Sequence, residues 1–151
     1  PVIIVIILAI ILGIILAKTG FGRRVFAVGS NEDAARLSGI NVVRTKILAY
    51  VLCGATSAFA GISLASRLSS AQSNAGTGYE LEGIAAAVIG GTSTAGGEGS
   101  IIGTVIGAMV MGVLRNGLNL LKVDAFVQMI IIGSIIVAGV WYDTFRRRKR
   151  V

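Results

Sequence analysis

The sequence predicts an all-α, polytopic transmembrane protein of about five spans with one short cytoplasmic helix. Apolar residues make up 54% of the 151 residues and only 14% are charged. Several uncharged runs are long enough to cross a membrane, and the basic residues gather at the ends of these runs. Because a hydrocarbon core of about 30 Å needs roughly 20 apolar helical residues, this pattern argues against a soluble domain.

The composition also limits the chemistry of the chain. There is no His and only one Cys, so the chain can form no internal disulfide, His-based acid–base pair or Cys/His metal site. No G-x-x-x-x-G-K-[ST] motif occurs, so any ATP must be bound by another chain. The net charge of +7 could suggest nucleic acid, but no basic stripe with interleaved aromatic residues is present. We therefore expect no enzyme activity, cofactor or nucleic-acid partner.

The first apolar run covers residues 2–17. No basic segment precedes it, and the sequence around Lys18 is a poor cleavage site, so a transmembrane helix is preferred to a signal peptide. The chain opens at Pro1 without Met, which suggests a fragment of a longer protein and leaves open what precedes it. Residues 47–66 form the second predicted span.

Between these two runs, Ser30 to Ile40 has the pattern of a self-contained short helix. Ser30 and Asp33 fit a capping box, and Gly39 can take the left-handed conformation that ends a helix. Isolated helices shorter than about 12 residues are marginal in water. This helix should therefore dock against a partner.

The second half begins with a polar stretch, 67–82, which is predicted to be a loop with Glu80 and Glu82 as solvated residues. Apolar runs follow at 83–95, 101–121 and 125–142. The run at 83–95 is short and rich in glycine, so its sequence leaves open a full span, a broken span or a re-entrant segment.

The distribution of basic residues predicts the orientation. Segment 18–46 and the tail 146–151 are both strongly basic and are expected on the cytoplasmic side. Two cytoplasmic regions require an even number of crossings between them. This parity favours 83–95 as one of four crossings.

Two groups of residues stand out in the run 101–121 and just before it. Gly99, Gly103 and Gly107 recur every four residues, a spacing that lets helix backbones approach each other in lipid. Arg115 lies near the outer end of the run, where snorkelling of its side chain to the interface is the preferred interpretation.

Asn116 and Asn119 share a face of the same helix. They could bind neighbouring helices or the hydroxyls of a passing sugar, and the second role is preferred by a small margin because they face largely away from the glycines. Gln128, early in the last run, is interpreted as an interhelical contact.

Three motifs carry a resemblance to a known family. Asp33-Ala34-Ala35-x-x-x-Gly39 resembles the EAA-x-x-x-G loop of bacterial ABC-importer permeases, with Asp in place of Glu. The glycine-rich run from Ile89 to Ser100 and the sequence from Asn116 to Leu120 are similar to the same permeases. The chain thus looks like the C-terminal half of a permease of the ribose/monosaccharide type.

This resemblance implies a single transmembrane permease domain over 1–151, with 18–46 as a cytoplasmic coupling loop and 146–151 as a basic cytoplasmic tail. The protein would lie in the bacterial cytoplasmic membrane, with a separate ABC ATPase, a second permease subunit and a periplasmic sugar-binding protein as partners. Which sugar is carried, and whether the two permease subunits are identical, stay open. The residues that would contact the ATPase are Asn31, Asp33, Ala34, Ala35, Leu37 and Gly39.

Two other classes are weighed against this prediction. A secondary transporter would need ionisable residues near the middle of a span, and no run has a central Asp, Glu or His. A structural or lipid-binding membrane protein would use 146–150 as an anchor to anionic lipid. That role would leave the short helix at 30–40 without a purpose.

Overall fold

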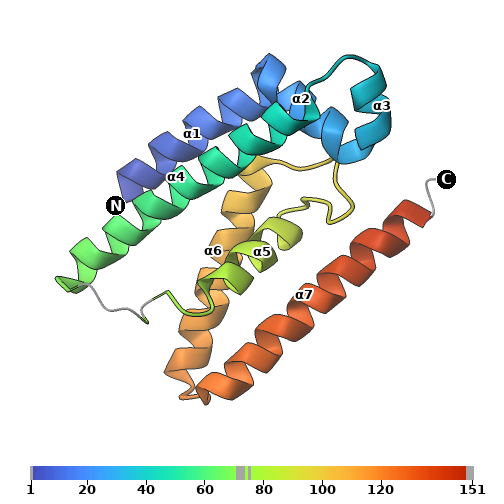
Figure 1. Ribbon diagram of the computed structural model, residues 1–151. Helices are drawn as coiled ribbons and strands as arrows, with labels where there is room; N and C mark the ends of the chain where they lie inside the picture. Colours follow the sequence, from blue (N-terminus) through green and yellow to red (C-terminus); the bar gives the residue numbers. More distant parts are fainter. Residues whose placement is uncertain (1, 71–73, 75, 149–151) are drawn as a thin grey trace. The chain divides into compact units, whose positions relative to one another are not determined.

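The computed structural model describes residues 2–70, 74 and 76–148, apart from the side chains of 142 and 146–148. All regular elements in these residues are helices (Figure 1). They belong to two compact units, residues 1–77 and 78–151. The helices are α1 (Val2–Lys18), α2 (Gly20–Ser30), α3 (Glu32–Leu37), α4 (Val42–Leu68), α5 (Tyr79–Ile89), α6 (Ile101–Leu120) and α7 (Ala125–Arg148).

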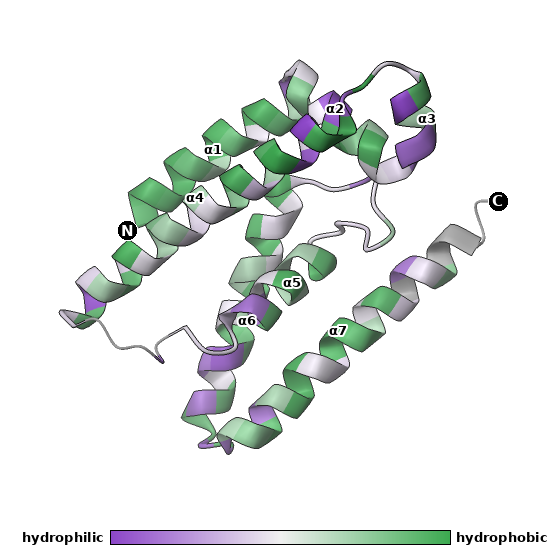
Figure 2. Ribbon diagram, in the orientation of Figure 1, coloured by the Kyte–Doolittle hydropathy of each residue, from purple (hydrophilic) through white to green (hydrophobic). Residues whose placement is uncertain are grey.

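The length and composition of these helices confirm a polytopic helical membrane protein. Among the described residues, α4, α6 and α7 are each long and apolar enough to cross a membrane, and α1 with α2 makes a fourth candidate if the bent pair is one span. Large apolar side chains are exposed along all of them. Figure 2 shows α1 hydrophobic along its length, with hydrophilic residues gathered in α2 and α3.

By length and composition alone, three helices of the described residues qualify as spans, or four with the bent pair, against about five predicted. The difference lies in 83–95, where the structure has α5, a helix of 11 residues that starts at Tyr79. At 1.5 Å per residue this helix is about 16 Å long, roughly half of the hydrocarbon thickness. The expected crossing thus contains a helix too short to span alone.

In the first unit, the chain bends by 70° between α1 and α2. Thr19 lies at the bend, where its hydroxyl donates to the carbonyl of Ile15 at 2.6 Å and accepts from the amide of Gly22 at 3.4 Å. A Cβ on Gly22 would lie only 1.9 Å from the carbonyl oxygen of Leu16, so a larger residue would force the bend open. Segment 18–46, expected as a loop with one short helix, thus contains α2 as well.

The spans predicted from the apolar runs begin at defined caps. Asn41 caps α4 by accepting from the amide of Arg44 at 3.0 Å, and Ser100 caps α6 by accepting from that of Gly103 at 3.4 Å. The helices extend beyond the predicted 47–66 and 125–142, because flanking polar residues continue them. As a result, α7 ends at Arg148 and includes the first three residues of the predicted basic tail, 146–148.

In the second unit, α5 packs against both α6 and α7. The core consists of Ala85 and Ala86 from α5, Met111 from α6 and Ile132 from α7. Small residues on α5 let both neighbours approach closely, so the short helix forms the centre of the unit.

A second contact joins the loop after α5 to α7. The hydroxyl of Ser93, which is buried, donates to Oδ2 of Asp143 at 2.8 Å and accepts from the amide of Ala95 at 3.3 Å. The backbone of Ser93 also bonds Glu98 and Gly96 within the loop. One serine thereby fixes the glycine-rich loop and holds it against α7.

Candidate functional site

The short helix α3 is closed by hydrogen bonds at both ends. Asn31 has an extended backbone, and its Oδ1 accepts from the amide of Ala34 at 2.9 Å. At the other end, the amides of Gly39 and Ile40 donate to the carbonyls of Arg36 and Ala35, with Gly39 at φ +79°. This is the bonding pattern of a Schellman motif, which explains how a helix of six residues can end cleanly.

The predicted start of this helix was wrong by one residue. Ser30 is the last residue of α2, and Asn31 both ends that helix and caps α3. Asn is among the best N-cap residues, and a single extended residue suffices to separate the two helices. The left-handed conformation predicted for Gly39 is confirmed.

The two faces of α3 differ in exposure. Ala35 is buried, at 4% of its accessible area, on the side that packs against α2 and α4. Asp33, Ala34 and Leu37 are exposed, and Leu37 reaches 91%. Leu37 thus presents a large apolar side chain that the rest of the described residues leave uncovered.

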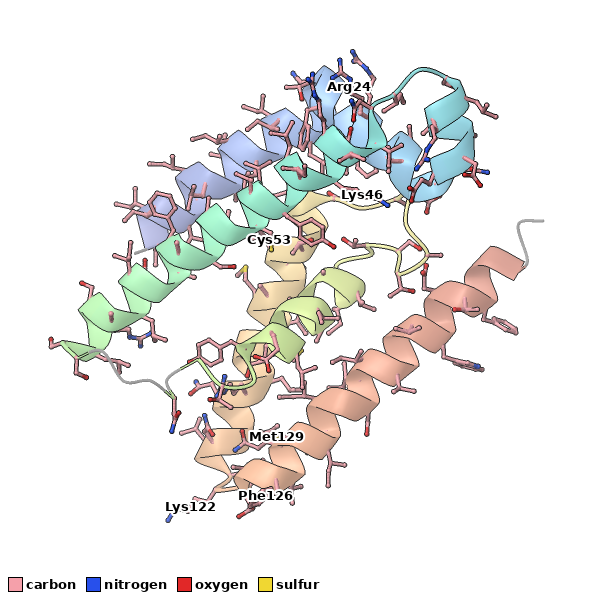
Figure 3. The ribbon with its side chains drawn as sticks, viewed as in Figure 1. Arg24, Lys46, Cys53, Lys122, Phe126 and Met129 are labelled. Carbon is pink, nitrogen blue, oxygen red and sulfur yellow. The ribbon has the colours of Figure 1, made fainter. Side chains whose placement is uncertain are left out.

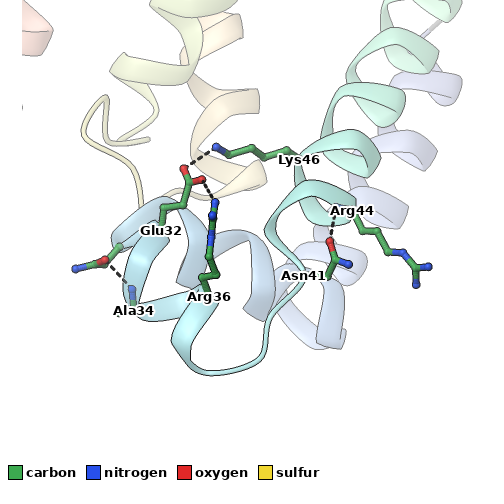
Figure 4. A network of polar contacts seen from close by, with 7 residues as sticks. Glu32, Ala34, Arg36, Asn41, Arg44 and Lys46 are labelled. Atoms are coloured by element: carbon green, nitrogen blue, oxygen red, sulfur yellow. Dashed lines mark hydrogen bonds and ion pairs between the residues drawn. The ribbon is translucent and has the colours of Figure 1, made fainter.

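Charged side chains tie α3 to α4 (Figure 4). Glu32 accepts a hydrogen bond from Lys46 of α4 at 2.6 Å and another from Arg36 at 3.2 Å. The hydrogen bond from Lys46, followed by the positive charges of both partners, lowers the pKa of Glu32 below its ordinary value. Lys46 lies 14 residues from Glu32, and this separation matches no helical or strand period from which the pair could be predicted.

The predicted glycine row lies between α6 and α5. A Cβ on Gly103 would come within 2.0 Å of the carbonyl oxygen of Gly90, and one on Gly107 within 2.0 Å of that of Ala86. Gly99 precedes α6. A Cβ on Gly99 would lie 3.1 Å from Cγ2 of Thr92. The row thus faces the short helix and the loop that follows it.

Further along the same face, Arg115 pairs with Glu82 of α5. Its guanidinium also lies over the ring of Tyr79, 5.0 Å from the centroid. The expectation of a snorkelling Arg115 is therefore replaced by an ion pair, and Glu82 belongs to a helix rather than a solvated loop. The two residues are 33 apart in the chain, so only tertiary structure could show the pair.

Asn116 and Asn119 are both exposed on α6. Oδ1 of Asn119 accepts from Nε2 of Gln128 at 2.9 Å, and the same amide group donates to the carbonyl of Val123. Asn119 thus takes part in the turn between α6 and α7, where Figure 3 shows Lys122 and Phe126. In the basic tail, residues 149–151 lie outside the described residues, and only the helical backbone of 146–148 is described.

Comparison with known proteins supports a membrane permease. Residues 2–140 match the family described as branched-chain amino acid transport system / permease component. The chain is 51% identical over 143 residues to the ribose import permease protein RbsC of Bacillus subtilis, which is 95% of this chain and 44% of that protein. No match was found among solved structures.

Two further relatives are permeases with other names. The chain is 48% identical over 150 residues to the xylose transport system permease protein XylH of Haemophilus influenzae, covering 99% of this chain and 40% of that protein. It is 47% identical over 141 residues to the L-arabinose transport system permease protein AraH of Escherichia coli, covering 93% of this chain and 43% of that protein. The chain spans less than half the length of the curated relatives it matches.

Proposed function

The chain belongs to the family of branched-chain amino acid transport system / permease components, and on this premise we propose that it is part of the permease subunit of an ATP-driven sugar importer. The importer would lie in the bacterial cytoplasmic membrane. Its ATP would be bound by a separate ATPase subunit, and this chain would perform no covalent chemistry. A second permease subunit and a periplasmic sugar-binding protein would complete the assembly.

The proposed coupling rests on the geometry of α3. The helix is capped at both ends. The face that carries Ala35 packs against α2 and α4, and Leu37 on the other face is 91% exposed. A rigid, protruding helix with an apolar anchor suits a cleft in a partner protein. We assign the contact with the ATPase to the exposed residues among those predicted, which are Asn31, Asp33, Ala34, Leu37 and Gly39. Ala35 is buried against the chain itself, so its part in coupling is to position the helix.

The contact between Glu32 and Lys46 gives a route from α3 to a membrane span. A shift of α3 would pull on Lys46, which lies in the second turn of α4. An exposed ion pair contributes little stability, but together with the packing of Ala35 it sets where α3 lies on α4. In this mechanism the ATPase moves α3, and α4 follows between inward- and outward-open states.

The substrate class is proposed from the relatives. RbsC, XylH and AraH are named for ribose, xylose and L-arabinose, which are all aldopentoses. The family description instead names branched-chain amino acids. We favour an aldopentose because these individual relatives are 47% to 51% identical to this chain, whereas a family description covers more distant members.

The test of coupling uses the complete permease that contains this chain, purified from the membrane. Mass spectrometry should find an ABC ATPase bound to the wild-type permease. Leu37→Asp should abolish that association while the permease still inserts. Ser38→Ala, a change beside it on the same helix end, should retain the ATPase. An ATPase that stays bound to Leu37→Asp would contradict docking through α3.

The substrate is tested separately in proteoliposomes that contain the permease, its ATPase and its binding protein. ATP-dependent uptake of labelled D-ribose, D-xylose and L-arabinose is compared with uptake of leucine. Uptake of at least one pentose and none of leucine is expected. Uptake of leucine alone would reject the sugar assignment and leave the coupling role untouched.

A further inference from the structure

A cluster of three side chains in the second unit has no role in the proposed coupling. Glu82 and Tyr79 come from the first turn of α5, and Arg115 comes from the second half of α6. The guanidinium of Arg115 pairs with Glu82 and lies 5.0 Å from the centre of the Tyr79 ring. The cluster thus combines a carboxylate, a guanidinium and an aromatic face.

All three side chains remain partly accessible. The side chains of Arg115 and Glu82 are 38% and 26% exposed, and Tyr79 is 44% exposed. Arg115 is the fifteenth residue of α6, a helix long and apolar enough to cross a membrane, and lies about 8 Å from the helix end at 1.5 Å per residue. Charged groups within a span are costly in hydrocarbon, and they generally pair with one another and face the protein interior or a water-filled cavity. The open side of the cluster therefore faces water or protein.

The pair is not needed to hold α5 against α6. Gly103 and Gly107 already bring the two backbones into contact, next to a core that contains Met111. An ion pair that stays accessible to water contributes little net stability, because solvent screens the attraction and both side chains lose freedom when they pair. A role in helix packing alone thus leaves the two charges unexplained.

We propose that Tyr79, Glu82 and Arg115 form a contact site for the transported sugar on its way through the permease. This inference rests on the proposed function as a sugar importer. A carboxylate accepts hydrogen bonds from sugar hydroxyls, and a guanidinium donates to them in a fixed geometry. The exposed ring of Tyr79 offers an apolar face for the C–H groups of a pentose.

The arrangement also suits a site of passage rather than of tight binding. With no sugar present, the carboxylate of Glu82 and the guanidinium of Arg115 pair with each other, so neither charge of the cluster lacks a partner. A passing polyol replaces part of this mutual contact with its own hydroxyls, and the charges pair again when it leaves.

The test measures the relative uptake of D-ribose, D-xylose and L-arabinose by the complete importer in proteoliposomes. These pentoses differ in the orientation of their hydroxyls, and the binding protein is the same in every sample. Glu82→Gln should change the ratio between the two fastest pentoses by about two- to tenfold, as expected for one altered hydrogen bond. Glu80→Gln, in the same turn of α5 and exposed, is the matched control and should keep the wild-type ratio.

Tyr79→Leu tests the site without removing either charge, and it should change the same ratio. Assembly is followed by recovery of the complex with its ATPase. Assembled variants that lower all three uptake rates equally would overturn the proposal and leave a structural pair. Loss of assembly in Glu82→Gln, with normal ratios in Tyr79→Leu, would overturn it as well. A wild-type importer that carries no pentose would instead reject the proposed function.

Discussion

Gly103 of α6 lies so close to Gly90, at the end of α5, that a Cβ on Gly103 would come within 2.0 Å of the Gly90 carbonyl oxygen. Gly107, one turn further along, has the same relation to the carbonyl of Ala86. Both obstacles are backbone atoms, which cannot rotate away as a side chain can. These glycines therefore set the distance between the two helices.

The first prediction is that Gly107→Ala destabilises the second unit by about 1–3 kcal/mol, as expected when a methyl group is forced into a packed contact. Thermal unfolding of the purified permease in detergent measures the effect. Gly112→Ala is the matched control on the same helix, because its Cβ would meet no atom within 4 Å. Equal melting temperatures for both variants would show that α5 and α6 separate easily at Gly107.

The second prediction concerns pH and the contact between Glu32 and Lys46. The pKa of Glu32 is lowered from an ordinary value of 4.5 by the hydrogen bond from Lys46. Because the pKa of Glu32 is lower in the folded protein than in the unfolded chain, the stabilisation from this contact is fully present above pH 4.5. It is lost as the pH falls through the pKa of Glu32 in the folded protein. A nitroxide on Ser38→Cys, in a Cys53→Ala background, should therefore become more mobile in acid.

Two variants complete this experiment. Glu32→Gln should show the increased mobility already at neutral pH, since a neutral amide cannot form the ion pair. Asp33→Asn removes the neighbouring carboxylate, which is exposed, and should behave like the wild type. An acid-induced change that persists unaltered in Glu32→Gln would assign the pH response to another group.

The third prediction concerns the left-handed turn after α3. Gly39 has φ +79°, and no atom lies within 4 Å of a Cβ placed on it, so the cost of substitution is purely conformational. Gly39→Val should cost on the order of 1 kcal/mol or more, and should reduce transport and transport-stimulated ATPase activity in a permease that still inserts. Ser38→Ala should have a much smaller effect. Full coupled transport in Gly39→Val would count against a docked α3.

The fourth prediction separates the two asparagines of α6. Asn116→Leu should weaken transport or shift sugar preference with assembly intact, since Asn116 is exposed away from the glycine row. Asn119→Leu also removes the acceptor for Gln128 and should lower stability by roughly 0.5–1.5 kcal/mol.

A double-mutant cycle with Gln128→Leu measures how much of the Asn119 effect belongs to that hydrogen bond. Assembly lost in both Asn116→Leu and Asn119→Leu, with unchanged sugar preference in the remaining complex, would identify them as interhelical contacts. The pathway would then lie elsewhere.

The sequence alone determined the features that depend on local composition and backbone preference. Long apolar runs predicted α4, α6 and α7, because the bilayer fixes how many residues a span requires. The turn at Gly39 was predictable because glycine readily adopts positive φ. The three family motifs were also visible, and the comparison with permeases agrees with them.

Only the tertiary structure decided the features that join distant residues. The N-cap of α3 is Asn31 rather than the predicted Ser30, because α2 continues up to Ser30. The local sequence pattern did not indicate that helix. The starting residue of α5 and its position between α6 and α7 depend on packing rather than on a long apolar run. The pair of Glu82 with Arg115 spans 33 residues, and a separation of that size has no helical or strand period in the sequence from which it could be predicted.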